Sequence, residues 1–142
     1  MRFAALVTWI LAALLGGYLL ATWIVKGGMR RTGERRSRFA PPLILGHATL
    51  AATGLGLWVT YLVVATSVLA WTALADLGVV AVLGATMFGM WLKTARRSRG
   101  RHTSAPRHAA EDHFPPPAVL AHGLFAVTTV VLVLITALQA AG

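Results

Sequence analysis

Two histidines in repeated settings are the residues of this sequence whose types and spacing point most directly to chemistry. His47 lies in the segment 39–57, and the segment 114–132 nearly repeats it with His122 at the matching position. Each copy begins with a phenylalanine and a pair of prolines, places its histidine five residues past the second proline, and continues as an apolar run. Ionisable side chains are costly inside a membrane, so matched histidines in apolar segments indicate a functional site.

The composition indicates what kind of protein holds these histidines. Of 142 residues, 57% are hydrophobic and 12% are charged, with 13 Lys and Arg against 4 Asp and Glu. Soluble domains carry about a quarter charged residues, and here the apolar residues form runs long enough to cross a bilayer. The net charge of +9 lies mostly in two loops between these runs, so we expect no nucleic-acid partner. Because cysteine is absent, thiolate metal sites and covalently attached c-type haem are excluded.

The apolar runs predict four transmembrane helices in a single domain over residues 1–142, at about 3–25, 43–64, 76–92 and 117–139. Proline pairs suit the first turns of the second and fourth helices. Asp76 is interpreted as the N-cap of the third helix, after a connection at about 65–75. The pair Gly16-Gly17 is interpreted as a close-packing point between helices. The predicted fold is an all-α, integral membrane, four-helix up-down bundle.

The basic residues predict how this bundle is oriented. The loops 26–38 and 93–113 contain twelve of the thirteen Lys and Arg residues, and two helices separate them, so both lie on one side of the membrane. The positive-inside rule places these loops in the cytoplasm and both termini outside. We therefore expect a multi-pass protein of the cell inner (plasma) membrane, with the lipid bilayer as its first partner.

The matched depth of the two histidines favours a haem. The second and fourth helices run parallel, and His47 and His122 lie about 7–8 Å along the axis past their prolines. Structural zinc sites take four protein ligands, whereas a porphyrin supplies four nitrogens and needs only axial ligands. Cofactor sites in bundles are built from facing side chains. We therefore expect one bis-histidine haem b, with His47 and His122 as the metal ligands.

Other residues are expected around this cofactor. Small or flat residues on the histidine faces would lie beside the ring: Ala51 and Gly54 on the second helix, and Phe125 and Ala126 on the fourth. Arg38 and Arg107 are candidate partners of the haem propionates. Met87 and Met90 are interpreted as packing residues. The loop residues His102, His108, Glu111, Asp112 and His113 are interpreted as a solvated loop in preference to a metal cluster. No catalytic residues are predicted, because the sequence contains no P-loop, catalytic triad or paired-carboxylate motif.

The repeated histidine segments resemble the membrane b-type cytochromes, helical bundles in which histidines from different transmembrane helices hold haem. The resemblance covers the second and fourth helices. It implies electron transfer, usually between a quinone and a partner redox protein or complex subunit, and hence a role as a subunit of a membrane oxidoreductase. Larger members carry four histidines for two haems, whereas this chain offers two, which puts transmembrane electron transfer by this chain alone in doubt.

Two other interpretations remain open at this point. A duplicated helical hairpin would keep two hydrogen-bonding histidines in a haem-free membrane anchor or accessory subunit of a larger complex. The histidines of a transporter component would line a proton or substrate path. Transporters built from repeats usually place their site near the membrane midplane, whereas these histidines are expected nearer one surface.

Overall fold

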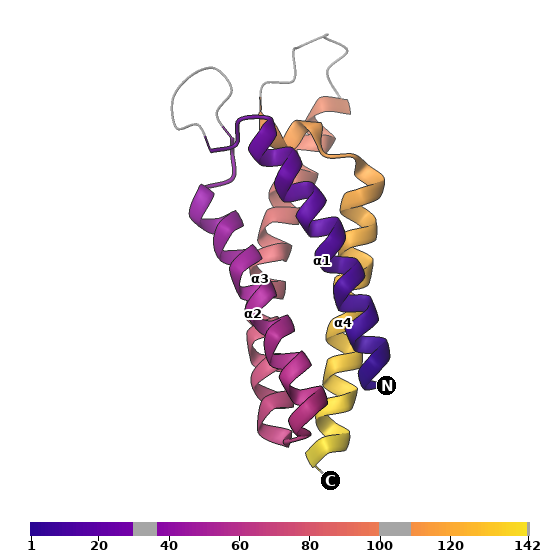
Figure 1. The fold of residues 1–142 in the computed structure, drawn as a ribbon. Helices are drawn as coiled ribbons and strands as arrows, with labels where there is room; N and C mark the ends of the chain where they lie inside the picture. The colour runs from indigo at the N-terminus through magenta and orange to yellow at the C-terminus, as the bar shows by residue number, and fades with distance from the viewer. Residues whose placement is uncertain (30–36, 100–108, 142) are drawn as a thin grey trace.

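The structure is a computed structural model that describes residues 1–29, 37–99 and 109–141. In these residues the chain forms four α-helices, α1 (Arg2–Val25), α2 (Pro41–Val64), α3 (Ser67–Arg99) and α4 (Pro116–Ala141), and a short 3₁₀ helix η1 (Ala110–His113) before α4 (Figure 1). Each α-helix is long and apolar enough to span a membrane, α3 over Ser67–Lys93. The predicted all-α membrane bundle is confirmed, and the chain is a multi-pass membrane protein.

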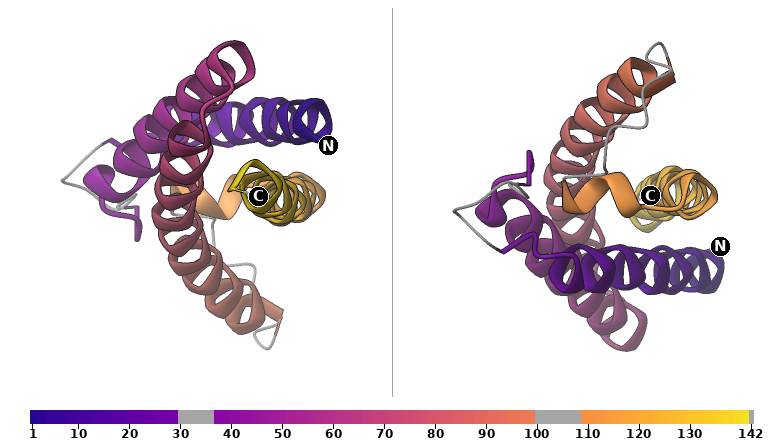
Figure 2. Two further views of the ribbon diagram at one scale, coloured as in Figure 1. Left: turned by 90° about the horizontal axis from the view of Figure 1, so that it is seen from below. Right: turned by 90° about the horizontal axis from the view of Figure 1, so that it is seen from above.

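The four helices alternate in direction, as an up-down bundle requires. Both termini lie at one end of the bundle, and the helix ends that flank residues 30–36 and 100–108 lie at the other (Figure 1). The main packing is between α1 and α4 and between α2 and α3. Views along the bundle show α2 and α4 in diagonal positions (Figure 2). A side chain on α2 can therefore meet one on α4 only across the centre of the bundle.

The beginning of α3 differs from the sequence prediction. The helix begins at Ser67, so the connection expected over 65–75 consists of Ala65 and Thr66 alone. Ala65 adopts the left-handed conformation, with φ 57°, and its N–H donates to the carbonyl of Tyr61 at 2.8 Å, which ends α2. Asp76 is consequently inside α3, more than two turns from its start. The interpretation of Asp76 as a helix cap is wrong.

The two hairpins of the chain are related by an internal two-fold repeat. Gly84 of α3 follows Gly16 of α1 by 68 residues, and His122 of α4 follows His47 of α2 by 75. Applying the same two shifts along the helices brings buried residues onto buried residues. The matching buried pairs are Ala5 and Ala73, Trp9 and Leu77, Ala12 and Val80, Ile44 and Val119, Gly54 and Thr129, Trp58 and Val133, and Tyr61 and Thr136. The sequence repeat in the histidine segments is thus part of a repeat of whole hairpins.

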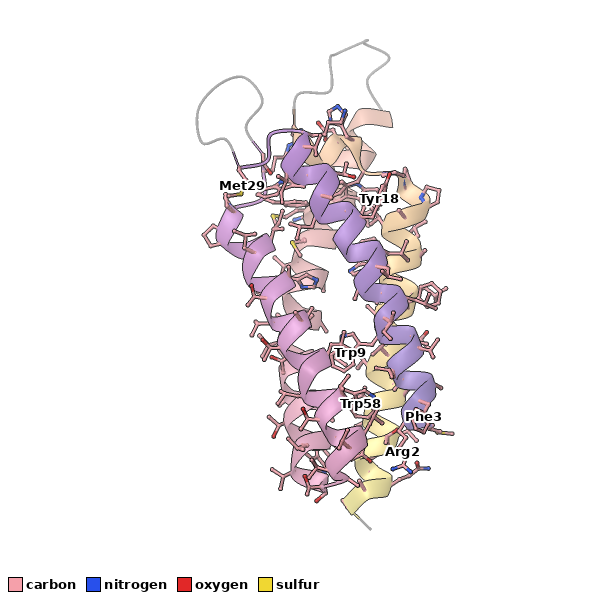
Figure 3. The ribbon with its side chains drawn as sticks, viewed as in Figure 1. Arg2, Phe3, Trp9, Tyr18, Met29 and Trp58 are labelled. Atoms are coloured by element: carbon pink, nitrogen blue, oxygen red, sulfur yellow. The ribbon has the colours of Figure 1, made fainter. Side chains whose placement is uncertain are left out.

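Two apolar clusters close the bundle on either side of the histidines. The cluster at the terminal end contains Trp9 and Trp58, whose rings point towards each other from α1 and α2 (Figure 3) with centroids 6.4 Å apart. The other contains Trp23 and Phe39, and Met87, Met90 and Trp91 pack against it. Packing is thus the role in which the structure places both methionines, as the sequence indicated. The part of the bundle that contains His47 and His122, here called the histidine layer, thus lies between two apolar clusters that contain tryptophan.

Helix α1 ends in a glycine motif that seats Trp23. Gly27 has a φ of 86°, a conformation that favours glycine, and its N–H donates to the carbonyl of Ile24 at 3.0 Å. The N–H of Gly28 donates to the carbonyl of Trp23 at 2.8 Å, which completes a Schellman motif. Gly28 lies so close to the Trp23 indole that a Cβ at this position would overlap the ring. The absence of a side chain at Gly28 therefore allows the indole to be fully buried.

We expect Gly28→Ala to destabilise the bundle, because the added methyl group must displace a buried indole. Overpacking of this kind typically costs about 1–3 kcal/mol. Gly17→Ala on α1 is the matched control, since nothing lies within 4 Å of a Cβ there. Thermal unfolding in detergent, followed by tryptophan fluorescence, should show a lower midpoint for Gly28→Ala alone. Equal midpoints for the two variants would contradict this account of the Trp23 seat.

Candidate functional site

The two repeated histidines face each other across the centre of the bundle. The ring centroids of His47 on α2 and His122 on α4 are 6.3 Å apart, and their planes are inclined at 72°. Both side chains remain partly exposed, whereas Trp9 and Trp58, which lie on the terminal side of them, are buried. The structure therefore brings together the two side chains that the sequence repeat singled out.

Each histidine is held by a main-chain carbonyl of the neighbouring helix. Nδ1 of His47 lies 3.1 Å from the carbonyl oxygen of Val80 on α3, and Nδ1 of His122 lies 2.9 Å from that of Ala12 on α1. A carbonyl oxygen only accepts hydrogen bonds, so Nδ1 carries the hydrogen in both rings. In the neutral imidazole the lone pair is then on Nε2. Both rings thus have a fixed orientation and keep Nε2 available as a ligand atom.

A glycine one turn beyond each carbonyl allows the ring to lie against the helix. A Cβ at Gly84 would lie 3.1 Å from Cε1 of His47, and a Cβ at Gly16 would lie 3.0 Å from Cε1 of His122. The prediction that Gly16 is a close-packing point is confirmed, and its partner is His122. Nothing lies within 4 Å of a Cβ at Gly17. Gly84 was missed by the sequence analysis, although a tryptophan seven residues later follows both Gly16 and Gly84.

The residues expected beside a haem ring occupy several environments. Gly54 is two turns from His47 along α2, where a Cβ would contact the Trp9 ring and the Asp76 carboxylate. Ala51 is partly buried against the cluster of Trp9 and Trp58. On α4, Phe125 and Ala126 are both partly buried. The cofactor contacts assigned to these four residues stay predictions, and the structure places Gly54 beside the Trp9 ring.

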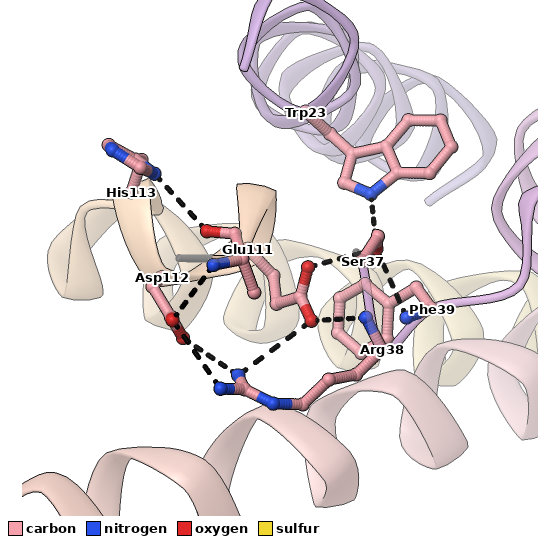
Figure 4. Close-up of polar contacts among 8 residues, drawn as sticks. Trp23, Ser37, Arg38, Phe39, Glu111, Asp112 and His113 are labelled. Atoms are coloured by element: carbon pink, nitrogen blue, oxygen red, sulfur yellow. Dashed lines mark hydrogen bonds and ion pairs between the residues drawn. The ribbon is translucent and has the colours of Figure 1, made fainter. Parts of the chain in front are cut away.

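A buried carboxylate joins the two halves of the chain at the loop end of the bundle (Figure 4). The side chain of Glu111, in η1, accepts hydrogen bonds from the Ser37 hydroxyl at 2.9 Å and from the Arg38 main-chain N–H at 2.7 Å. Ser37 in turn accepts from the indole N–H of Trp23 at 2.9 Å. Glu111 is 1% exposed. The expectation of a solvated loop is therefore wrong for residues 109–113, because Glu111 is buried and its carboxylate accepts hydrogen bonds from residues of the first hairpin.

The guanidinium of Arg38 is engaged by the neighbouring carboxylate. Its Nη1 lies 2.8 Å from Oδ1 of Asp112. The hydrogen bond that the guanidinium donates to Asp112 raises the pKa of Arg38 against the opposing effect of desolvation, and the charges of Asp112 and Glu111 raise it further. The structure thus gives Arg38 a partner within the protein, and its pairing with a haem propionate stays a prediction. Arg107, His102 and His108 lie outside the described residues.

The remaining loop histidine does not gather metal ligands around it. Nδ1 of His113 lies 3.3 Å from the carbonyl oxygen of Ala109 in the preceding turn. Within residues 1–29, 37–99 and 109–141, no three His, Cys, Asp or Glu side chains are grouped so that they could hold a metal ion. The paired histidines of the bundle therefore need a cofactor that brings its own equatorial ligands if they are to bind a metal.

We expect Glu111→Ala to destabilise the protein more than Asp112→Ala. The first change leaves the Ser37 hydroxyl and the Arg38 main-chain N–H, both in part-buried hydrogen bonds, without their acceptor, which costs about 1–3 kcal/mol. The second removes an ion pair whose Arg38 side chain is 48% exposed, and such pairs contribute about 0–1 kcal/mol. Thermal unfolding of both variants in one detergent measures the difference. An equal or reversed ranking would show that the Glu111 network does not hold the hairpins together.

Comparisons with known proteins leave the function to be argued from this geometry. No protein-family model, curated protein sequence or solved structure matches the chain. The features available for that argument are the facing imidazoles, their main-chain acceptors on the neighbouring helices and the glycines beneath the rings.

Proposed function

We propose that the chain is a membrane electron-transfer protein that binds one haem b, with His47 and His122 as its axial ligands. The observation that carries the proposal is the separation of 6.3 Å between two imidazoles with free Nε2 atoms. Metal–imidazole bonds are about 2.0–2.1 Å long and each nitrogen is about 1 Å from its ring centre, so two axial imidazoles have centroids about 6 Å apart. The residues present fit the group in number, donor type and spacing.

The chain's own residues orient these ligands. The carbonyls of Val80 and Ala12 take the Nδ1 hydrogens, which fixes the tautomer and raises the basicity of the ligand nitrogen. Gly84 and Gly16 let the rings lie close to the neighbouring helices. The apolar clusters on either side of the histidine layer limit the access of water to it. When bound, the haem would supply a one-electron redox centre.

The membrane orientation and the partners follow from the charge distribution and from the cytochrome resemblance. The basic segments 26–38 and 93–113 are placed in the cytoplasm of the cell by the positive-inside rule, so the termini face outside the plasma membrane. His47 is six residues from the start of α2 and hence nearer the cytoplasmic surface. We propose that electrons are exchanged with a quinone or with a partner redox protein or complex subunit.

One observation favours a second candidate, a haem-free anchor or accessory subunit. The hydrogen bonds from His47 to Val80 and from His122 to Ala12 each join two helices of the bundle. Such bonds hold transmembrane helices together without a cofactor. The two functions differ in whether the purified protein carries haem.

We expect His47→Ala and His122→Ala each to abolish a low-spin b-type spectrum, since each variant lacks one of two axial ligands. His113→Ala is the control, because this side chain bonds only within its own turn. Difference spectra of dithionite-reduced and oxidised protein, purified after expression with ample haem, measure the effect. If the unsubstituted protein shows no Soret band, the accessory-subunit function replaces the electron-transfer function.

A second pair of variants tests whether the imidazole ring of His47 must lie against α3 for haem to bind, and keeps both histidines. Gly84→Leu should push against His47 and weaken haem binding by about 1–3 kcal/mol, which is roughly fivefold to 150-fold in affinity. Gly78→Leu, on the same helix, is the matched control, because nothing lies within 4 Å of a Cβ there. If the two variants retain haem equally, the ring of His47 does not take part in the site.

The proposed orientation can be tested with single cysteines, because the chain has none of its own. Thr66 and Met29 are both exposed and are at opposite ends of the bundle. An impermeant maleimide added to intact cells should label Thr66→Cys and spare Met29→Cys until the cells are opened. The reverse pattern would place the histidine layer nearer the outer surface.

A further inference from the structure

Asp76 is a carboxylate inside the membrane-spanning part of α3, where the sequence analysis expected a helix cap. Its Oδ2 is buried and has no hydrogen-bond partner, which is true of no other buried side-chain nitrogen or oxygen in the described residues. The side chain lies against Gly54 of α2 and close to the Trp9 ring of α1, since a Cβ at Gly54 would contact both. An acidic group in these surroundings needs a physical explanation.

The internal repeat supplies the comparison. The residue related to Asp76 is Thr8, and the residue related to Gly54 is Thr129. In that half of the bundle the Thr129 hydroxyl lies 2.9 Å from the Thr8 hydroxyl, which in turn lies 3.1 Å from the carbonyl oxygen of Ala5. In one half, this position is therefore occupied by two neutral hydroxyl groups that are hydrogen-bonded to each other. The other half has a carboxylate and, opposite it, a residue without a side chain.

Among the side chains that the structure describes, those around Asp76 offer it no compensating cation. From α1 it meets Trp9 and from α2 it meets Gly54. The ionisable groups on the faces packed around it are His47 and Tyr61, each two turns from Gly54 along α2, and His122 beyond His47. Arg2 is two turns from Trp9 and exposed at the end of the bundle. A charged carboxylate without a partner is expensive in an apolar interior, whereas the neutral acid costs far less.

We propose that Asp76 is a proton-binding carboxyl, which is neutral while the layer of His47 and His122 carries no charge and releases its proton when that layer becomes positive. This coupling rests on the proposed haem function. About 10 Å of helix separates Gly54 from His47, and a positive charge at the histidines favours the carboxylate form of Asp76. When one electron from a quinol or another reductant cancels that charge, one proton from water binds Asp76. When a quinone or a partner redox protein removes that electron, Asp76 releases one proton to water.

The proton site is tested first on protein without haem, so that its outcome does not depend on the proposed function. The apolar reagent N,N′-dicyclohexylcarbodiimide reacts with a neutral carboxyl group. The acid proton moves to one nitrogen, the carboxyl oxygen adds to the central carbon, and rearrangement leaves a stable N-acylurea with no leaving group. Mass spectrometry should find one adduct on Asp76 in the unsubstituted protein and in Thr129→Val, and none in Asp76→Asn. Absence of the adduct from the unsubstituted protein would overturn the proposal.

The coupling is tested on the haem-loaded protein by its midpoint potential. Uptake of a proton on reduction makes the potential fall as the pH rises. We expect this fall in the unsubstituted protein and in Thr129→Val, and a flat profile in Asp76→Asn. Asp76→Thr, which copies the related residue Thr8, should also give a flat profile if it folds as Asp76→Asn does. A slope that survives in both Asp76 variants would show that Asp76 is uncoupled from the site, while a protein without haem would overturn the proposed function and leave the labelling result standing.

Discussion

The structure depends on one constraint, which is that a polar side chain within the membrane needs a partner inside the protein, and among the described residues only Asp76 leaves a buried side-chain atom without one. His47 and His122 meet this constraint by donating to the main chain of a neighbouring helix, at Val80 and at Ala12. A main-chain carbonyl is available at every turn of a helix and has a second lone pair for such a bond. The cost is that the ring must lie close to the helix, so the position one turn further along each of these helices must be glycine or must give way.

The same constraint explains how the bundle is organised along its length. The histidine layer lies between the cluster around Trp9 and Trp58 and the cluster around Trp23. In each cluster a buried tryptophan has an acceptor for its indole N–H: the Trp58 indole donates to the carbonyl of Arg2 at 3.3 Å, and the Trp23 indole donates to Ser37. The large aromatic residues thus combine extensive apolar burial with a single directed hydrogen bond. The histidine layer thus lies between two apolar clusters, in which the tryptophan N–H groups have different acceptors: a main-chain carbonyl for Trp58 and a serine hydroxyl for Trp23.

The sequence was sufficient for the parts of the fold that follow from hydrophobicity and periodicity. Four spans, their alternating directions and the meeting of His47 with His122 all follow from run lengths and from one repeat. The start of α3 was misplaced because Trp71 suggested an interface and Asp76 a helix cap, while the turn that reverses the chain contains neither glycine nor proline. The Glu111 network was missed because its partners lie more than 70 residues away. Gly84 could have been found, since its spacing to Trp91 repeats that of Gly16 to Trp23.

The internal two-fold repeat has a consequence for how such a bundle can specialise. Two separate copies of one hairpin, paired in the same way, would present every substitution twice, so an acid opposite a glycine in one half would recur in the other half. A single chain that contains both hairpins escapes this restriction. It keeps equivalent residues where both halves serve the shared axis, as at His47 and His122. It can also have a pair of hydroxyls in one half and an acid opposite a glycine in the other. Covalent fusion of the two hairpins therefore permits different polar residues at positions that the repeat makes equivalent.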